Sequence, residues 1–265
     1  MGKDSGTSST TVLGVDVGAT GFKGGLVDVK TGTMLTDRHR FDTPQPATPA
    51  AMAYTFRSLV DHFEYSGIVG VGFPAVVTRN VAKTAANIDK GWIGTSISET
   101  FGRMRDVSIY ALNDADAAGI ATMNYGTGRS HKEDGTVVMI TIGTGLGGAM
   151  FLDGELVPNF ELGSLYLKGM DIIAEKFISN KVRKDNNMDW KTFGKRLNKY
   201  LRHVNAVLNP DLIVLGGGGS KYYQDYKKYL KVDCNVKPAE MRNTAGTVGA
   251  AVYAYQRHHR KMGAI

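Results

Sequence analysis

Short apolar runs rich in β-branched residues alternate along this chain with stretches of helical periodicity. Buried strands are predicted at Thr11–Val17, Ile68–Phe73, Val107–Leu112, Thr136–Ile142 and Leu212–Leu215. Stretches with helical spacing lie between several of these strands, an alternation that is typical of α/β proteins. The pattern therefore predicts an α/β fold.

The clearest helical pattern runs from Asp189 to Leu208. Its apolar positions recur at helical spacing, at Trp190, Phe193, Leu197, Leu201, Val204 and Leu208. Basic residues recur on the opposite side, at Lys191, Lys195, Lys199 and Arg202. A solvated helix face is the default interpretation of such a row, and a binding surface is the alternative. A last helical pattern, from about Thr247 to Arg260, ends in a basic stretch that we expect to fray.

A glycine-rich turn follows the first predicted strand and leads directly into another strand. It carries Asp16, Gly18, Thr20 and Gly21. The glycines let backbone N–H groups approach an anion, Thr20 adds a hydroxyl group, and Asp16 is suited to hold a hydrated Mg²⁺ ion. No helix follows, so this is not a dinucleotide-binding fingerprint, and the sequence has no GxxxxGK[ST] P-loop. An ordinary hairpin turn is the alternative.

The same design occurs a second time, where Gly143, Thr144 and Gly145 link the strand at residues 136–142 to a returning strand. Two such turns facing one another would clamp a phosphate chain from both sides, and the duplication is stronger evidence than either copy alone. A third glycine segment, Gly216-Gly217-Gly218, lies between a predicted strand and a predicted helix. That order favours an anion or adenosine site.

Two adjacent polar residues, Asn113 and Asp114, follow an apolar run and precede a helical pattern. Side chains at the carboxyl end of a strand face the crevice in which α/β proteins bind ligands. Asp114 is therefore a candidate general base, and Asn113 a candidate to orient a hydroxyl group. A plain helix N-cap is the alternative. Glu161, in a later loop, is a candidate acceptor for sugar hydroxyl groups, although an isolated exposed glutamate often has no function.

The composition narrows the class of protein. A chain of 265 residues is long enough for one large domain or two small ones. The single cysteine, Cys234, excludes an internal disulfide and a cysteine-built zinc site, and it favours an intracellular, cytoplasmic location. We expect no membrane partner, because no apolar stretch is long enough to span a bilayer and residues 1–10 lack a secretory apolar core.

The net charge of +7 is concentrated in residues 170–231, which hold thirteen Lys and Arg against six Asp and Glu. A local positive field favours a polyanionic partner, whether a chain of phosphates, an anionic surface or nucleic acid. The basic residues lack interleaved aromatic residues at a recognisable spacing, so we expect no nucleic-acid partner. A basic surface without a partner is an equally good interpretation of the composition.

The set of motifs resembles the sugar kinases of the ROK family, which share the actin-like ATPase (ribonuclease H-like) fold. Within the family it is similar to the polyphosphate-dependent glucokinase branch, which includes polyphosphate/ATP glucomannokinases. The resemblance covers nearly the whole chain, from about Val12 to Ala254. Its most specific segments are Asp16–Gly24, Thr84–Lys90, Leu112–Gly119, Thr141–Gly145, Val157–Gly163, Asn209–Leu212 with Gly216–Gly218, and Pro238–Asn243.

The resemblance implies two α/β domains flanking a cleft, at residues 11–113 and 114–265, after a disordered N-terminus at residues 1–10. The C-terminal helix is expected to pack back on the N-terminal domain. Relatives are commonly dimers, so a homodimer is expected. The cysteine-rich zinc motif of the family is absent from this sequence, as it is from the polyphosphate branch, and we expect no zinc.

The resemblance also assigns roles. Asp114 would take the proton from the 6-hydroxyl group of glucose, while Asn87, Asn113 and Glu161 bind other hydroxyl groups, with Ser164 at the position of a further sugar contact. The first two glycine turns, with Lys23 beside the first, would hold the phosphoryl donor together with Mg²⁺. The third glycine segment would line an adenosine site.

The implied reaction transfers a phosphoryl group from inorganic polyphosphate, and also from ATP, to glucose, giving glucose 6-phosphate. The donor assignment depends on the resemblance together with the basic row, in which Lys191 and Lys195 would line a groove for polyphosphate. An ATP-dependent kinase of another hexose, such as mannose or fructose, is a second hypothesis. A non-catalytic sugar-binding regulator is a third.

Three positions depart from the family pattern. Ser164 stands where the family has a histidine that is expected to touch the sugar, which leaves sugar identity and affinity open. Ala75 follows Pro74 where a glycine is usual, and Ala19 replaces a glycine in the first turn. Both alanines add a methyl group where backbone and ligand are expected to come close.

Overall fold

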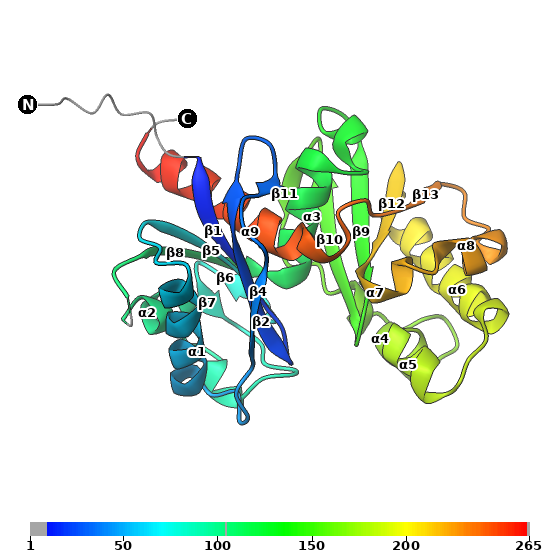
Figure 1. Ribbon diagram of the computed structural model, residues 1–265. Helices are drawn as coiled ribbons and strands as arrows, with labels where there is room; N and C mark the ends of the chain where they lie inside the picture. Colours follow the sequence, from blue (N-terminus) through cyan, green and yellow to red (C-terminus); the bar gives the residue numbers. More distant parts are fainter. Residues whose placement is uncertain (1–9, 104, 264–265) are drawn as a thin grey trace, which may run out of the picture. The chain divides into compact units, whose positions relative to one another are not determined.

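The computed structural model describes residues 10–103 and 105–263 (Figure 1). The chain divides into two compact units, one made of Met1–Leu112 with Thr247–Ile265 and the other of Asn113–Gly246. The disorder predicted for residues 1–10 concerns a segment that, except for Thr10, lies outside the described residues.

A six-stranded sheet forms the centre of the first unit. Its strands are β1 (Thr11–Val17), β2 (Gly21–Asp28), β3 (Thr33–Met34), β4 (His39–Asp42), β5 (Ile68–Phe73) and β8 (Ser108–Asn113). Their order is β3-β2-β1-β5-β8, and β4 also pairs with β2. The β1–β2 hairpin is antiparallel and sets Asp16 opposite Lys23, whereas β5 runs parallel to β1.

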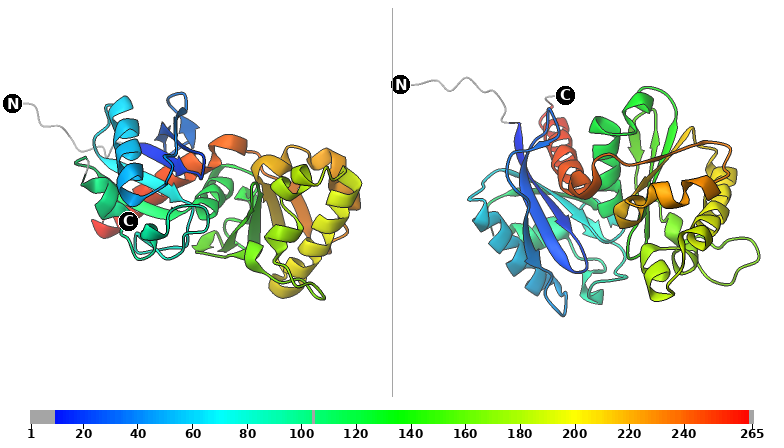
Figure 2. Two further views of the ribbon diagram at one scale, coloured as in Figure 1. Left: turned by 90° about the horizontal axis from the view of Figure 1, so that it is seen from below. Right: turned by 45° about the vertical axis from the view of Figure 1, so that its right-hand side comes forward.

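Helices cover both faces of this sheet (Figures 1 and 2). On one face lies α1 (Pro49–His62), whose Leu59 comes within 2.6 Å of the position that a Cβ atom would take at Gly24. On the other lies α9 (Ala245–Lys261), and a Cβ atom at Gly70 would collide with the carbonyl group of Ala250. Glycine is therefore required where the α9 backbone meets the strand backbone.

The basic C-terminal stretch belongs to α9, which continues to Lys261. Our expectation that this stretch frays is wrong. Lys and Arg in the last turn interact favourably with the negative end of the helix dipole, which gives a physical reason for the helix to continue.

Aromatic residues form the centre of the first unit's core. Phe101, on α2 (Ile97–Gly102), stacks on Phe56 of α1 with ring centroids 4.5 Å apart. The same ring meets the Trp92 ring edge-on, with centroids 5.6 Å apart. Trp92 ends the short 3-10 helix η1 (Lys90–Trp92), which follows a small hairpin of β6 (Val77–Thr78) and β7 (Val81–Ala82).

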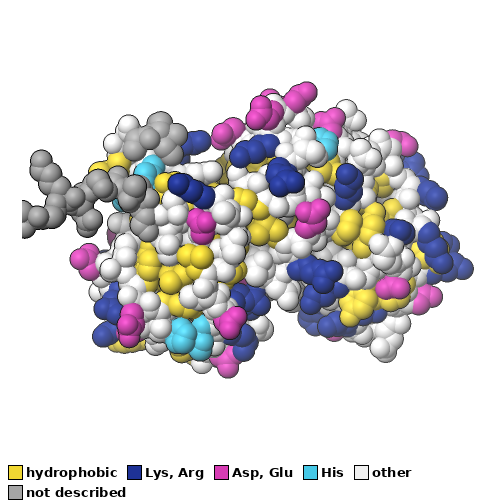
Figure 3. Space-filling model, turned by 45° about the horizontal axis from the view of Figure 1, so that its top comes forward, with side chains coloured by type: hydrophobic (Ala, Val, Ile, Leu, Met, Phe, Trp, Pro, Cys, Tyr) yellow, Lys and Arg dark blue, Asp and Glu magenta, His cyan; other side chains and the backbone are white. Residues whose placement is uncertain are grey.

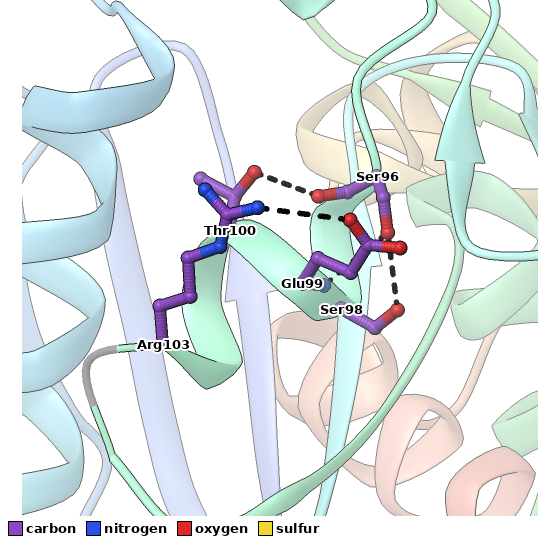
Figure 4. Close-up of polar contacts among 5 residues, drawn as sticks. All are labelled: Ser96, Ser98, Glu99, Thr100 and Arg103. Atoms are coloured by element: carbon purple, nitrogen blue, oxygen red, sulfur yellow. Dashed lines mark hydrogen bonds and ion pairs between the residues drawn. The ribbon is translucent and has the colours of Figure 1, made fainter.

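The start of α2 is fixed by its cap. The Ser96 hydroxyl group accepts a hydrogen bond from the N–H group of Glu99 at 3.2 Å. Glu99 in turn pairs with Arg103 one turn later, at 3.9 Å, on the exposed side of the helix (Figure 4). The cap anchors the segment between η1 and strand β8.

A five-stranded sheet forms the centre of the second unit. Its strands are β9 (Thr136–Ile142), β10 (Leu146–Leu152), β11 (Glu155–Val157), β12 (Leu212–Gly216) and β13 (Asn235–Pro238). Their order, β11-β10-β9-β12-β13, repeats the order in the first unit, with an antiparallel hairpin at the centre and a parallel strand beside it. The duplication seen in the two glycine turns therefore extends to the whole sheet.

Two long helices cover this second sheet on opposite faces (Figure 2). α3 (Asp114–Tyr125) packs on β10, where a Cβ atom at Gly119 would lie 2.7 Å from the Phe151 ring. α6 (Trp190–Leu208) contributes Phe193 and Leu197 to a core that includes Val138 of β9. The remaining helices of this unit are short: α4 (Ala174–Phe177), α5 (Asn180–Asp185), α7 (Gly217–Ser220), α8 (Tyr223–Tyr226), and the 3-10 helices η2 (Arg129–His131), η3 (Leu162–Ser164), η4 (Lys227–Tyr229) and η5 (Arg242–Thr244).

Within the described ranges, none of the helices combines the length and the apolar character that crossing a bilayer requires.

Candidate active site

Asn113 and Asp114 lie where strand β8 passes into helix α3. The Oδ1 atom of Asn113 caps the helix by accepting hydrogen bonds from the N–H groups of Ala115 at 2.8 Å and Asp116 at 3.1 Å. Asp114 is the first residue of the helix and is partly exposed, and its Oδ1 atom accepts from the Ala115 N–H group at 2.8 Å. Because Asn113 supplies the cap, capping alone does not explain why an aspartate stands at position 114. The positive end of the helix dipole also favours a negative charge there.

The first glycine turn joins β1 to β2. The N–H group of Gly18 donates to the carbonyl group of Gly21 at 2.9 Å, which closes the turn. Thr43, the residue after β4, donates a hydrogen bond from its hydroxyl group to the carbonyl group of Gly18 at 2.6 Å. Thr20 is exposed at the tip. The Gly18 amide is thus used inside the turn, and the Thr20 hydroxyl group is what the turn presents to solvent.

Basic side chains surround this first turn. Lys23 Nζ lies 3.9 Å from Asp16 Oδ2, and Arg40 donates to the carbonyl group of Thr20 at 2.7 Å. Arg38 also acts electrostatically on Asp16. The sequence alone pointed to Lys23 but not to the two arginines. The pairing of β2 with β4 sets Arg40 opposite Lys23, and knowledge of that pairing would have pointed to Arg40.

Asp16 fits a magnesium ion that is held mainly by the phosphates of a donor. Its side chain is 24% exposed, and burial raises its pKa, while Lys23 and Arg38 act in the opposite direction. A bound cation would relieve this unfavourable burial of negative charge. Mg²⁺ commonly takes one or two carboxylates and completes its shell with water and phosphate oxygens. The described part of the chain holds no cluster of three or more His, Cys, Asp and Glu residues suited to a metal ion.

The second glycine turn joins β9 to β10 and is closed in the same way, by a hydrogen bond from the Gly143 N–H group to the Gly145 carbonyl group at 2.9 Å. Thr144 is exposed at its tip, as Thr20 is in the first turn. The N–H groups of Asn180 and Lys181, at the start of α5, both donate to the carbonyl group of Gly143, at 3.0 and 3.3 Å. These two hydrogen bonds connect the turn to the start of α5.

The third glycine segment, Gly216-Gly217-Gly218, packs against the second turn. Gly217 has a φ of 74°, and a Cβ atom there would lie 2.7 Å from the carbonyl oxygen of Ile142, the residue before Gly143. The helix that we expected beyond the glycines is present as α8 and η4, and a further short helix, α7, begins already within the glycines at Gly217. The left-handed conformation of Gly217 turns the chain from strand directly into helix. The proposed adenosine segment and one phosphate turn are thus neighbours in the second unit.

Glu161 directly precedes the short helix η3 and Ser164 is its last residue, and both are exposed. Partial burial raises the pKa of Glu161, and the Glu175 carboxylate raises it further. Glu175, on α4, also accepts a hydrogen bond from the N–H group of Leu146, next to Gly145, at 3.2 Å. Glu175 therefore lies close to both Glu161 and the second turn. The sequence alone did not point to Glu175, because no local motif distinguishes this glutamate.

Asn87 is exposed in the loop between β7 and η1, and so it belongs to the first unit. Next to it, Asp89 caps η1 by accepting a hydrogen bond from the Gly91 N–H group at 2.7 Å. The Lys90 amino group donates to the carbonyl group of Ala85. These local bonds fix the loop. Of the candidate sugar ligands, Asn87 comes from the first unit and the others come from the second.

Lys191 and Lys195 are exposed in the first two turns of α6, whose N-cap is Asp189. Lys199, further along the same row, lies with Nζ 5.8 Å from the centre of the Phe177 ring. Figure 3 shows Lys and Arg side chains gathered on the surface of the second unit. The structure therefore leaves Lys191 and Lys195 accessible to a polyanion, and a groove around them stays a prediction.

Two repeated sheets, each with a threonine-tipped glycine turn, are typical of the actin-like ATPase fold, and the acidic residue at the start of α3 fits a phosphotransferase of that class. The chain belongs to the ROK family, which it matches over residues 12–158.

Three known proteins illustrate the similarity. The polyphosphate glucokinase of Mycobacterium tuberculosis (strain CDC 1551 / Oshkosh) is 42% identical over 241 residues, which are 91% of this chain and 89% of that protein. The crystal structure of an inorganic polyphosphate/ATP-glucomannokinase from Arthrobacter sp. strain KM is similar with a TM-score of 0.87 at 39% identity, covering 94% of this chain and all of that one. A ROK family glucokinase from Streptomyces griseus, solved with glucose and AMPPNP, shares the fold, with a TM-score of 0.79 at 20% identity over 93% of this chain and 99% of that one.

Proposed function

We propose that this chain transfers a phosphoryl group from inorganic polyphosphate, and also from ATP, to the 6-hydroxyl group of glucose. The observation that carries the proposal is the arrangement at the start of α3, where Asn113 supplies the cap and the Asp114 carboxylate next to it is partly exposed. The 42% identity to a polyphosphate glucokinase, over 91% of the chain, supports both the reaction and the donor.

In the proposed mechanism, Asp114 accepts the proton of the 6-hydroxyl group as the oxygen attacks the terminal phosphorus of the donor. The bond from that phosphorus to the bridging oxygen breaks, and the shortened polyphosphate, or ADP, is the leaving group. Asn113, Glu161 and Asn87 bind other hydroxyl groups and so fix the sugar for in-line attack. Phosphoryl transfer depends mainly on such positioning and on neutralising charge. A positioned general base contributes roughly 10²- to 10⁴-fold to the rate.

The donor would be bound by the two glycine turns. Thr20, Lys23 and Arg40 supply a hydroxyl group and two cations at the first turn, and Thr144 supplies a hydroxyl group at the second. A magnesium ion held through water by Asp16 would neutralise charge on the transferred group. The adenosine of ATP would lie on the Gly216–Gly218 segment, and a longer phosphate chain would extend toward Lys191 and Lys195.

The test is a matrix of donors and sugars measured with Mg²⁺ present. Long-chain polyphosphate and ATP are each combined with glucose, mannose and fructose, and Asp114→Asn serves as the blank. We expect wild-type protein to phosphorylate glucose from both donors. Phosphorylation of glucose from ATP but not from polyphosphate would show that the donor assignment is wrong.

A kinase of broader hexose specificity is a second candidate, and Ser164 is the observation that favours it. The serine is exposed on η3 beside Glu161, and its side chain is much shorter than the histidine that the family resemblance leads us to expect. The solved relative at 39% identity is described as a glucomannokinase. A hydrogen bond left unmade in a buried site costs about 1–3 kcal/mol, enough to change sugar preference. Adding Ser164→His to the matrix tests this, because a variant more selective for glucose would support the second candidate.

Two further features stay predictions. A homodimer is expected from the family resemblance, and multi-angle light scattering of the purified chain measures it directly. A cytoplasmic location is expected from the single cysteine, and fractionation of the source cells would test it.

A further inference from the structure

A buried carboxyl group on α3 contacts the loop that carries Glu161. Asp116 lies in the first turn of α3 and is 1% exposed. Its Oδ2 atom accepts a hydrogen bond from the N–H group of Asn159 at 2.9 Å. Its Oδ1 atom is buried and has no hydrogen-bond partner among the described residues. An acid buried with one oxygen unsatisfied is costly to the fold, and such groups are concentrated at functional sites.

The loop that Asp116 contacts is a tight bend just before η3. Asn159 has a φ of 65°, in the left-handed region that asparagine tolerates better than most residues. The carbonyl oxygen of the next residue, Phe160, lies 2.7 Å from the position that a Cβ atom would take at Gly148 of β10. The bend is therefore held on one side by the β10 backbone and on another by Asp116, and Glu161 follows it directly.

We propose that Asp116 is a positioning residue whose carboxyl group ties the loop bearing Glu161 to the same helix end that bears Asn113 and Asp114. The inference rests on the proposed function, since the sugar-binding role of Glu161 comes from it. Asp116 acts through these neighbours and contacts the backbone of the loop, not the substrate.

The charge on Asp116 controls how firmly the loop is held. Burial raises the pKa of Asp116 to about 7, the Asn159 N–H group acts in the opposite direction, and the Glu161 carboxylate adds to the rise. The charged groups that act here are two acids, Glu161 on the loop, which acts on Asp116, and Glu175 on α4, which acts on Glu161. Loss of the proton therefore places a buried negative charge beside Glu161. Opening of the loop would return this carboxyl group to water, so we expect the loop to be held less and less firmly as the pH rises from about 4 to about 7, with no further change above that.

The first experiment measures amide hydrogen exchange of residues 157–165 without any substrate. Asp116→Asn keeps an oxygen acceptor for the Asn159 N–H group and cannot ionise, whereas Asp116→Ala removes the acceptor. Asp153→Ala is the matched control, because Asp153 accepts a backbone N–H group, that of Gly135, at 3.0 Å elsewhere in the same unit.

We expect exchange in this loop to be about ten-fold faster in Asp116→Ala than in wild type, the effect of losing one hydrogen bond. Asp116→Asn should retain its protection, corrected for intrinsic exchange, from pH 5 to pH 7, whereas wild type should lose protection over that range. Asp153→Ala should leave the loop unchanged. If the loop of Asp116→Ala exchanged at the same rate as that of wild type, the inference would be overturned. If that variant fails to fold, a pH dependence in Asp116→Asn equal to that of wild type would overturn it.

The second experiment measures KM and kcat for glucose over the same pH range. We expect Asp116→Ala to raise KM about ten-fold at unchanged or slightly lower kcat. Wild-type KM should rise between pH 5 and pH 7, and the KM of Asp116→Asn should stay level. Normal KM in a variant whose loop exchanges fast would show that Asp116 holds the loop without affecting the sugar, which overturns the coupling. A wild-type protein inactive on every sugar would instead contradict the proposed function, and the exchange result would still stand.

Discussion

The amino group of Lys23 lies 3.9 Å from Oδ2 of Asp16, directly across the β1–β2 hairpin. Both side chains are partly exposed, 30% for Lys23 and 24% for Asp16. Exposed pairs of this kind contribute little to stability, because water and salt screen them. The pair is therefore better explained by what it does at the phosphate turn than by what it adds to the fold.

Replacing Lys23 by methionine should weaken donor binding and leave the fold intact. The variant keeps most of the apolar stem but loses the charge, and a hydrogen bond to a charged group contributes about 1.5–3 kcal/mol. We expect KM for polyphosphate and for ATP to rise about 10- to 100-fold, with KM for glucose little changed. Lys30→Met, in the exposed turn after β2, is the control and should behave as wild type. Unchanged donor KM values would remove Lys23 from the phosphate site.

Substitutions at Asn113 and Asp114 should have separate effects, the first on stability and the second on catalysis. Asp114→Asn should lower kcat roughly 10²- to 10⁴-fold while Tm changes little, since Asn113 retains the cap. Asn113→Ala removes the acceptor for two N–H groups and should lower the free energy of unfolding by about 1 kcal/mol. Steady-state kinetics and thermal unfolding of the two variants, side by side, measure the difference. A large loss of Tm in Asp114→Asn with activity retained would reverse the two roles.

Lys191 and Lys195 should matter only for long phosphate chains. The double variant Lys191→Ala/Lys195→Ala should raise KM for long-chain polyphosphate several-fold and leave KM for ATP unchanged, and added salt should reduce the difference because exposed charges are screened. Both lysines are exposed, so the fold should tolerate the change. The matched control is Lys227→Ala/Lys228→Ala, which removes the same charge from the exposed helix η4 of the same unit. Equal effects of both double variants would mean that overall charge, not a groove at α6, attracts the donor.

Asp116 should make stability depend on pH. Because its pKa is raised from 3.8 to about 7, the folded protein binds this proton more tightly than the unfolded chain does. The contribution of Asp116 to the free energy of unfolding therefore falls as the pH rises from about 4 to about 7 and stays low above that.

Asp116→Asn removes this dependence. Its free energy of unfolding, relative to wild type, should shift in favour of the variant by up to about 4 kcal/mol between about pH 4 and pH 8. Urea unfolding of both proteins at the two pH values measures the shift, and taking the difference cancels titrating groups that do not interact with Asp116, such as Asp16. A difference that is the same at both pH values would show that Asp116 is not held protonated.

The sequence predicted best the features that depend on interactions between residues close together in the chain. Strand β1 and its glycine turn, the Asn113 cap and the long amphipathic α6 all follow from the residues within each segment, because turn chemistry, capping and helical periodicity act over a few positions. The two glycine turns also revealed the duplication, and the shared strand order of both sheets extends it. For the same local reason, the row of lysines on α6 could be read from spacing alone.

Tertiary structure decided what surrounds each motif. Arg40 reaches the first turn because β4 pairs with β2, Glu175 reaches the second because α4 packs beside it, and Asp116 meets Asn159 from 43 positions away in the sequence. No periodicity marks these residues, since their contacts depend on strand register and on how helices pack over the sheet. Sequence therefore determined which segments carry the chemistry. The burial and the neighbouring charges that shift the pKa values of these residues arise only when folding packs distant parts of the chain against one another.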